Sequence, residues 1–178
     1  AVHEAYGAIV ASAKAYAPSA HIDGVLVQRM VTAGREVIVG AATDPSFGKL
    51  VAFGLGGILV EVLRDVTFRL APATTAEAEG MLDSIKGAHV LGAFRGAPAV
   101  NRAALADLIR RVSDLTGDHP EIASIDLNPV FADEHGAVAA DVRIVLDFSP
   151  AAARPRFSNE EILRVMNRIM KPRAVAVI

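Results

Sequence analysis

The chain has 178 residues, of which 52% are hydrophobic, and a formal net charge of −2 at pH 7. This length suits one domain with a buried core, and the charge lacks the basic excess of nucleic-acid-binding proteins. The absence of cysteine excludes disulfides, thiol catalysis and thiolate metal sites. Without a signal segment or a run of about 18 apolar residues, the sequence predicts a soluble, cytoplasmic protein with neither nucleic-acid nor membrane partners.

The first part of the chain predicts a helix followed by an antiparallel meander. Residues 2–17 carry apolar side chains at helical spacing. Glycine-containing turns then separate three predicted short strands, at residues 25–30, 36–43 and 50–53. The glycine-rich residues 54–57 form neither a complete phosphate-binding loop nor a complete dinucleotide motif, and taken alone they indicate a close-packed turn.

The middle of the chain predicts two amphipathic helices. Thr74 and Glu77 have the spacing of a capping box at the start of a helix over residues 74–85. The clearest helical pattern covers residues 101–116, with Asn101 as its N-cap. Its apolar stripe is expected to pack against the sheet and consists of Ala104, Leu105, Leu108, Ile109, Val112 and Leu115.

Residues 122–147 predict two strands joined by a polar turn at residues 133–136. A loop of this length would fix how the two strands pair, because side chains alternate between the two faces of a strand. The register places four polar side chains on one face in two opposed pairs, Asn128 with Asp141 and Asp126 with Arg143.

An amide oxygen opposite a carboxylate can bind a hard cation. Mg²⁺ takes one or two such protein ligands and fills its remaining positions with phosphate oxygens and water. Periodicity alone favours a plainer interpretation, in which a solvated hairpin carries one cross-strand Asp–Arg pair.

The motif IDLNPV followed by AADVRI resembles the closing hairpin of the ATP-grasp domain in NDP-forming acyl-CoA synthetases. This family includes ADP-forming acetate–CoA ligases and is related to the β subunit of succinyl-CoA synthetase. Residues 24–72 resemble the nucleotide-binding core of the same family almost throughout. The resemblance implies an α+β fold, namely the C-terminal subdomain of an ATP-grasp domain with a mainly antiparallel sheet backed by helices, followed by a linker helix.

The resemblance also implies the residues that bind Mg·ATP. Asn128 and Asp141 would hold the Mg²⁺, and Glu36 matches a glutamate that contacts the nucleotide at the ribose, where a carboxylate can accept hydroxyl hydrogen bonds. The segment along the adenine edge would contribute Val27, Gln28, Met30 and Val31. Succinyl-CoA synthetase has an acidic residue at the position of Gln28, so the contact made by this side chain is left open.

No catalytic residue is assigned, although a second rank of candidates follows the glycine-rich turn. Arginine binds phosphate well through its two-pronged guanidinium group. The candidates are Glu61, Arg64 and Arg69. They face either a triphosphate or a phosphorylated segment, or else the charges in this stretch pair with one another.

The composition changes near the end of the chain. Residues 149–156 have the Pro/Ala-rich character of a linker, and Ser158 with Glu161 caps another amphipathic helix. Residues 171–178 resemble the first strand of the Rossmann-like CoA-binding domain of the same family. Two domains are therefore expected: an ATP-grasp domain that is incomplete at its N-terminus over residues 1–148, and a linker helix with a truncated CoA-binding domain over residues 149–178.

The resemblance implies the ATP-binding part of a ligase that makes acyl-CoA, ADP and phosphate from a carboxylic acid, CoA and ATP. Because the first subdomain of the family supplies a lysine and a phosphate-covering loop, this chain alone is expected to be an inactive half-site. Expected partners are the CoA-binding and CoA-ligase domains, in the same polypeptide or in a partner subunit, and a homodimer is left open. The alternatives are a regulatory ATP-grasp-like domain of a protein acetyltransferase and a small α+β interaction module that only binds cations.

Overall fold

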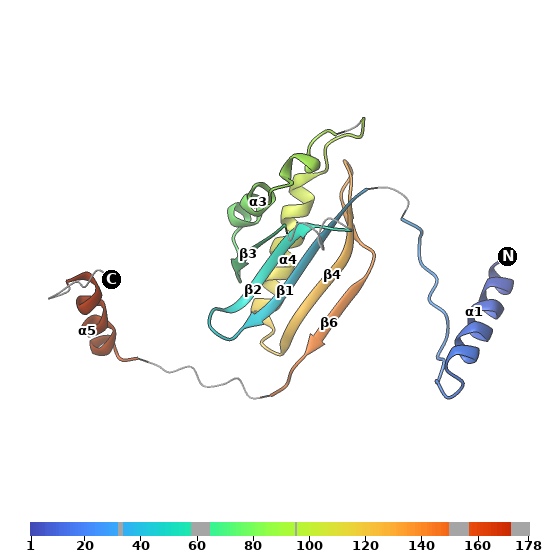
Figure 1. Cartoon of the computed structure of the whole chain (residues 1–178), viewed down its shortest axis with the longest axis horizontal. Coiled ribbons are helices and arrows are strands. Elements are labelled where there is room, and N and C mark those ends of the chain that lie inside the picture. Colours follow the sequence, from blue (N-terminus) through green and yellow to red (C-terminus); the bar gives the residue numbers. More distant parts are fainter. Residues whose placement is uncertain (32–33, 58–64, 95, 150–156, 172–178) are drawn as a thin grey trace, which may run out of the picture. The chain divides into compact units, whose positions relative to one another are not determined.

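The computed structural model describes residues 1–31, 34–57, 65–94, 96–149 and 157–171, and the chain forms two compact units, Ala1–Leu146 and Asp147–Ile178. The helices in Figure 1 are α1 (Val2–Tyr16), α3 (Thr75–Ser84), the 3-10 helix η1 (Ala88–Leu91), α4 (Arg102–Asp118) and α5 (Asn159–Met170). The strands are β1 (Arg35–Asp44), β2 (Gly48–Leu55), β3 (Val66–Leu70), β4 (Ile122–Ala132), β5 (Ala137–Ala139) and β6 (Val142–Leu146).

The strands of the first unit form one antiparallel sheet. Its order is β3-β2-β1-β4-β5, and β6 also pairs with β4. The strands predicted at residues 36–43 and 50–53 are confirmed as β1 and β2, whereas β3 was not among the predicted strands. Asp44 closes the turn between β1 and β2, because its Oδ1 accepts hydrogen bonds from the amides of Ser46 and Phe47 at 2.7 and 2.8 Å.

The prediction of a strand at residues 25–30 is wrong. These residues have no regular secondary structure, and Leu26 and Val27 are about four-fifths exposed. A strand is stable when its backbone groups find hydrogen-bonding partners on a neighbouring strand. Both sides of β1, the next strand along the chain, are already occupied by β2 and β4, so this segment has no place beside β1.

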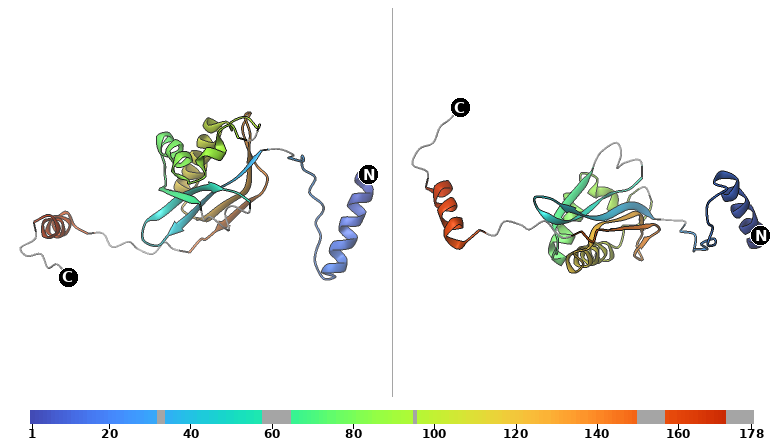
Figure 2. Two further views of the ribbon diagram at one scale, coloured as in Figure 1. Left: turned by 45° about the horizontal axis from the view of Figure 1, so that its top comes forward. Right: turned by 90° about the horizontal axis from the view of Figure 1, so that it is seen from below.

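Helices α3 and α4 cover one face of the sheet (Figures 1 and 2). Helix α4 contacts β1, β2 and β4, while α3 contacts β3 and α4. The core lies between the helices and the sheet, and its largest fully buried side chains are Phe53, Met81, Leu82, Leu91, Leu105 and Ile109. Burying these apolar groups is the main source of stability for this unit.

The predicted helix starts are confirmed by their capping contacts. The Thr74 hydroxyl accepts a hydrogen bond from the Glu77 amide at 3.3 Å, and the Glu77 carboxylate accepts one from the Thr74 amide at 2.8 Å. The backbone and hydroxyl of Thr74 lower the pKa of Glu77 by hydrogen bonding. Asn101 caps α4 by accepting from the Ala104 amide at 3.0 Å.

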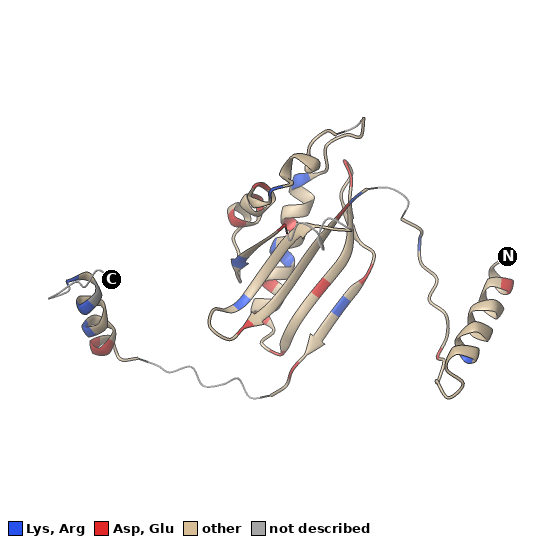
Figure 3. Cartoon of the chain, viewed as in Figure 1, with Lys and Arg blue, Asp and Glu red and all other residues tan. Residues whose placement is uncertain are grey.

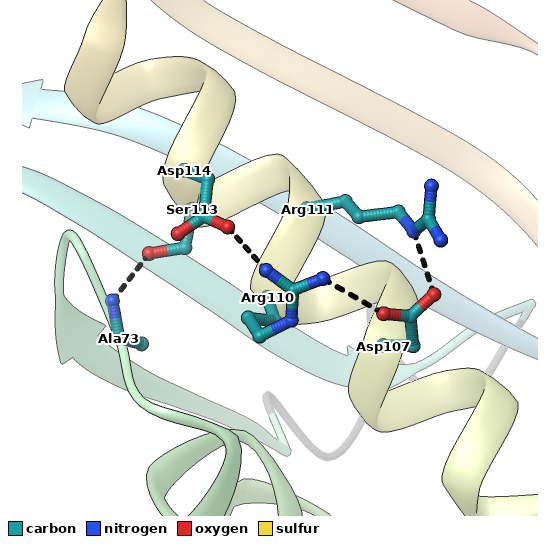
Figure 4. A network of polar contacts seen from close by, with 6 residues as sticks. All are labelled: Ala73, Asp107, Arg110, Arg111, Ser113 and Asp114. Atoms are coloured by element: carbon teal, nitrogen blue, oxygen red, sulfur yellow. Dashed lines mark hydrogen bonds and ion pairs between the residues drawn. The ribbon is translucent and has the colours of Figure 1, made fainter.

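The buried face of α4 differs from the predicted apolar stripe. Leu105, Ile109 and Val112 are buried as expected, but Leu115 is 40% exposed. Ser113 is fully buried instead, and its Oγ accepts a hydrogen bond from the Ala73 amide at 2.7 Å (Figure 4). This hydrogen bond offsets the cost of burying a hydroxyl, which an apolar periodicity does not detect.

The outer face of α4 carries an ion-pair network (Figure 4). Arg110 bridges Asp107 and Asp114, and the Nε of Arg111 also donates to Asp107, at 2.6 Å. The pKa of Asp107 is lowered, first by the hydrogen bond from Arg111 and then by that from Arg110. Exposed pairs of this spacing support a helix modestly.

The terminal helices form where the sequence predicts them. None of the residues of α1 is buried, and the capping box of Ser158 and Glu161 begins α5. Residues 150–156 of the predicted linker and 172–178 of the predicted last strand lie outside the described residues. No helix in the described ranges combines the length and the apolar character needed to cross a membrane.

Candidate functional site

The face of the sheet opposite α3 and α4 carries the polar candidates. In β1, Val37 and Val39 are buried, whereas Glu36 is exposed and Ile38 is half-buried. Because side chains alternate along a strand, Glu36 and Ile38 lie on the face that the helices leave open. Exposed Phe68 of β3, which pairs with Ala52, extends this open face.

The hairpin register predicted from the sequence is found in the structure. Ala132 pairs with Ala137, and Asp126 pairs with Arg143. In Figure 3 an acidic position on β4 accordingly lies beside a basic position on β6. The ladder is interrupted between β5 and β6, but the register is the same on both sides of the interruption, which places Asn128 opposite Asp141.

Asn128 lies on the open face at the start of a bulge in β4. Val39 pairs with Leu127 and Val37 pairs with Val130, so one residue of β1 lies opposite two residues of β4. The extra residue allows Leu127 and Val130 both to be buried, while Asn128 between them is exposed. Alternation after Leu127 exposes Asn128, and the bulge redirects Val130, which would otherwise lie on the open face with Asn128.

The turn that sets this register is closed by Asp133. Its Oδ1 accepts hydrogen bonds from the amides of His135 and Gly136 at 2.8 and 3.0 Å, and these contacts lower the pKa of Asp133. Gly136 does not adopt a positive φ, so the side chain of Asp133, not glycine geometry, shapes the turn. The Asn101 amide donates to the Asp133 carbonyl at 2.7 Å and ties the turn to the start of α4.

The Asn128–Asp141 pair fits a magnesium ion that arrives with phosphate. Both side chains are exposed and offer oxygen ligands, which Mg²⁺ prefers. The Oδ1 of Asp141 accepts a hydrogen bond from the Val142 amide at 3.0 Å, which orients the carboxylate and leaves Oδ2 for a cation. Within the described ranges no cluster of three or more His, Asp or Glu residues could hold a metal.

Glu36 lies on the same open face, near the start of β1. Its backbone carbonyl accepts a hydrogen bond from the Gly56 amide at 2.7 Å, and the residue pairs with Phe131 of β4. Glu36 is two residues from Ile38, which faces the bulge beside Asn128. The structure therefore brings Glu36, Asn128 and Asp141 onto one face.

The remaining candidates are described to different extents. Val27, Gln28, Met30 and Val31 belong to residues 25–31, which have no regular structure. Arg69 is half-buried on the side of the helices, where it donates to the Ser84 hydroxyl of α3 at 3.2 Å and to the Phe68 carbonyl at 2.8 Å. Glu61 and Arg64 lie outside the described residues.

Asp65 has a structural role that its sequence neighbourhood did not suggest. It is 4% exposed, and its two carboxylate oxygens accept hydrogen bonds from the amides of Lys86 and Gly87, both at 2.7 Å. A buried carboxylate that accepts two backbone hydrogen bonds holds its segment in place and does not face a triphosphate.

Sequence reasoning also missed Arg35. Its guanidinium donates to the carbonyls of Pro98 and Gly92 at 2.9 and 2.8 Å. These contacts hold the loop that contains Gly92 and Pro98 against the start of β1. Beside it lies a hollow of about 610 Å³, whose lining includes Phe94 and His135. An arginine at the start of a predicted strand gives no sequence signal for contacts 57 and 63 residues away.

Comparison with known proteins agrees with the family resemblance. A family profile described as an ATP-grasp domain matches residues 1–146. The chain is 49% identical over 143 residues to the acetate–CoA ligase (ADP-forming) I subunit beta of Pyrococcus furiosus, a match that covers 80% of this chain and 62% of the relative. The chain thus spans less than two thirds of the length of that relative.

Solved structures from Ca. Korarchaeum cryptofilum share the fold. A dinucleotide-forming acetyl-coenzyme A synthetase 1 in complex with coenzyme A, acetyl-coenzyme A and a phosphorylated phosphohistidine segment matches with a TM-score of 0.80 and 42% identity, over 82% of this chain and 65% of that chain. A second structure of that synthetase holds coenzyme A and Mg-AMPPCP, with its phosphohistidine segment pointing towards the nucleotide-binding site. It matches with a TM-score of 0.67 and 41% identity, over 76% and 63% of the two chains.

Proposed function

This chain belongs to the ATP-grasp domain family, and on that premise we propose that it is the Mg·ATP-binding part of an ADP-forming acid–CoA ligase. The intact enzyme would make acyl-CoA, ADP and phosphate from a carboxylic acid, CoA and ATP. The observation that carries the proposal is the placement of Asn128 opposite Asp141 on the open face of the sheet.

Asn128 and Asp141 hold the Mg²⁺ in this proposal. The ion supplies charge neutralisation to the phosphates during transfer. The hydrogen bond from the Val142 amide orients the Asp141 carboxylate before the nucleotide binds, which reduces the ordering needed on binding. Glu36, on the same face, accepts hydrogen bonds from the ribose hydroxyls.

The hinge residues Val27, Gln28, Met30 and Val31 contact the adenine edge in the bound state. Val27, Gln28 and Met30 are exposed and Val31 is half-buried, and these residues belong to no helix or strand of the structure. The proposed partners are the CoA-binding and CoA-ligase domains, supplied by the same polypeptide or by a partner subunit. Support comes from the relatives, one of which is named a β subunit and another of which was solved with coenzyme A and Mg-AMPPCP.

The test is product analysis with the intact protein that contains this chain. Release of ADP, AMP and phosphate from Mg·ATP is measured with a panel of carboxylic acids, with and without CoA. ADP and phosphate formed only when CoA and one acid are both present would support the proposal and name the acid. Formation of AMP, or no turnover with any acid, would contradict it.

The acetyltransferase alternative gains no specific support. The relatives described above are named as ligases or synthetases, and Glu36, Asn128 and Asp141 all lie on the open face. The proposal of a cation-binding interaction module is also less economical, because it leaves the match to the ATP-grasp profile over residues 1–146 unexplained.

A further inference from the structure

The end of β2 is built against Glu36. After Leu55 the chain turns at Gly56 and Gly57, and the Gly56 amide donates to the Glu36 carbonyl at 2.7 Å. A Cβ atom on Gly56 would lie 2.8 Å from the carbonyl carbon of Glu36, a distance that real Cβ atoms essentially never show. Gly56 is therefore required for the close approach of two backbone segments.

Gly57 meets a different part of Glu36. A Cβ atom on Gly57 would lie 2.9 Å from Oε2 of Glu36 and 3.9 Å from its carboxyl carbon, which are its contacts within 4 Å among the described residues. Gly57 also has a φ of 63°, in the left-handed region that favours glycine. The missing side chain of Gly57 thus leaves a space that the Glu36 carboxylate occupies.

The Glu36 carboxylate has no internal partner that would hold it. Within the described ranges the structure records no hydrogen bond or ion pair to its oxygens, and the side chain is exposed on the open face. Its acceptors are therefore available to a ligand, and its position is set by packing against the glycine turn.

We propose that Gly57 is a positioning residue for Glu36 and that its missing side chain keeps the carboxylate where it accepts hydrogen bonds from the ribose hydroxyls of a nucleoside triphosphate. This inference rests on the proposed function. The Cβ atom added at Gly57 meets the far end of the flexible Glu36 side chain, so beyond the backbone strain of a left-handed φ its effect falls on the contact with the ligand.

The chain offers a matched control at Gly96. This glycine also has a left-handed φ, of 80°, but an added Cβ there would meet nothing within 4 Å. Gly96→Ala introduces comparable backbone strain without displacing a carboxylate. Gly57→Asn is a second test variant, because asparagine tolerates a left-handed φ while still placing a Cβ atom beside Glu36.

The experiment compares ATP with 2′,3′-dideoxy-ATP, which lacks both ribose hydroxyls, as substrates of the intact protein. KM and kcat are measured for the wild type and for Glu36→Gln, Gly57→Ala, Gly57→Asn and Gly96→Ala. We expect both Gly57 variants to raise the KM for ATP about tenfold, as expected for loss of one hydrogen bond to a charged group. The KM for dideoxy-ATP and the kcat for ATP should change much less, and Gly96→Ala should preserve the preference for ATP.

Each outcome has a distinct meaning. If Glu36→Gln abolishes the preference for ATP but both Gly57 variants retain it, the positioning role is overturned and the ribose contact stands. Equal losses with ATP and dideoxy-ATP in the Gly57 variants, or the same pattern in Gly96→Ala, also overturn it, because backbone strain then explains the effect. If the wild type does not turn over ATP, the proposed function fails and this inference fails with it.

Discussion

Asn128 lies opposite Asp141 because the hairpin keeps one register from Ala132, at the turn, through to Asp126 in the middle of β4. The two oxygen-bearing side chains come from different strands and are exposed on the same open face. Their opposition follows from the turn length and from the alternation of side chains along a strand.

Replacing Asp141 tests whether this opposition holds a metal ion. In the intact protein, Asp141→Ala should lower ATP turnover about a hundredfold or more, since even indirect supports of metal ligands cost 10- to 100-fold. The unfolding temperature should change little, because Asp141 is exposed. Asp118→Ala, at the exposed end of α4, is the control for removing a carboxylate. Wild-type turnover in Asp141→Ala would rule out the metal assignment.

Asp65 should matter for folding. Asp65→Ala removes the acceptor for the amides of Lys86 and Gly87 and leaves them without partners, which should lower the free energy of unfolding by about 2–4 kcal/mol. Urea denaturation measures this loss. Asp83→Ala, which removes an exposed carboxylate paired with Arg102, should cost less than about 1 kcal/mol. Equal effects of the two substitutions would contradict the role assigned to Asp65.

On helix α4, Ser113 is fully buried whereas Leu115 is 40% exposed, the reverse of what their residue types suggest. Ser113→Ala leaves the Ala73 amide without its acceptor and should destabilise the protein by about 1–3 kcal/mol. Leu115→Gln should stay within about 0.5 kcal/mol of the wild type, because Leu115 is substantially exposed. Thermal unfolding of both variants measures the two effects. A larger loss of stability in Leu115→Gln than in Ser113→Ala would support the apolar stripe predicted from the sequence.

The Asp133 turn should give the hairpin a dependence on pH. The amides of His135, then of Gly136, lower the pKa of Asp133 below its ordinary value of 3.8. A carboxylate whose pKa is lowered by folding contributes stability above its unfolded pKa, and this contribution is lost as the pH falls through the folded pKa.

Asp133→Asn keeps an oxygen acceptor but removes the titration. We therefore expect the wild type to unfold at a higher temperature than the variant at about pH 6, with the difference shrinking as the pH falls below the ordinary value of 3.8. Thermal unfolding followed by circular dichroism across this range measures the difference. A gap that stays constant with pH would show that the charge of Asp133 plays no part.

The sequence predicted those parts of the fold that depend on local rules. The register of Asn128 and Asp141 follows from one turn and from period-2 alternation, and the helix starts at Thr74 and Asn101 follow from capping spacing. The bulge after Asn128 was not predicted, so the predicted alternation is correct from Ile125 to Asn128, whereas Val130 beyond the bulge is buried instead of lying on the face of Asn128.

The errors occur where distant residues decide the outcome. Residues 25–30 have the composition of a strand, but both sides of β1 are occupied. Arg69 was ranked with the phosphate-binding candidates, yet Ser84 of α3 holds it on the side of the helices. Ser113 is polar by type and buried by context, because the Ala73 amide, 40 residues away, supplies its partner. Propensity and spacing contain no information about such contacts.

A sheet covered by helices on one side only divides each strand into two sets of residues that evolve under different pressures. In β1, Val37 and Val39 contribute to the stability of the core, while their exposed neighbour Glu36 is the residue proposed to contact the nucleotide. Deleting one residue within β1 would exchange the two sets, turning Glu36 towards α4 and a valine towards solvent. A point substitution can change core stability or ligand binding alone, whereas an insertion or deletion within β1 would destroy both. Length variation among homologous chains should therefore be confined to the turns.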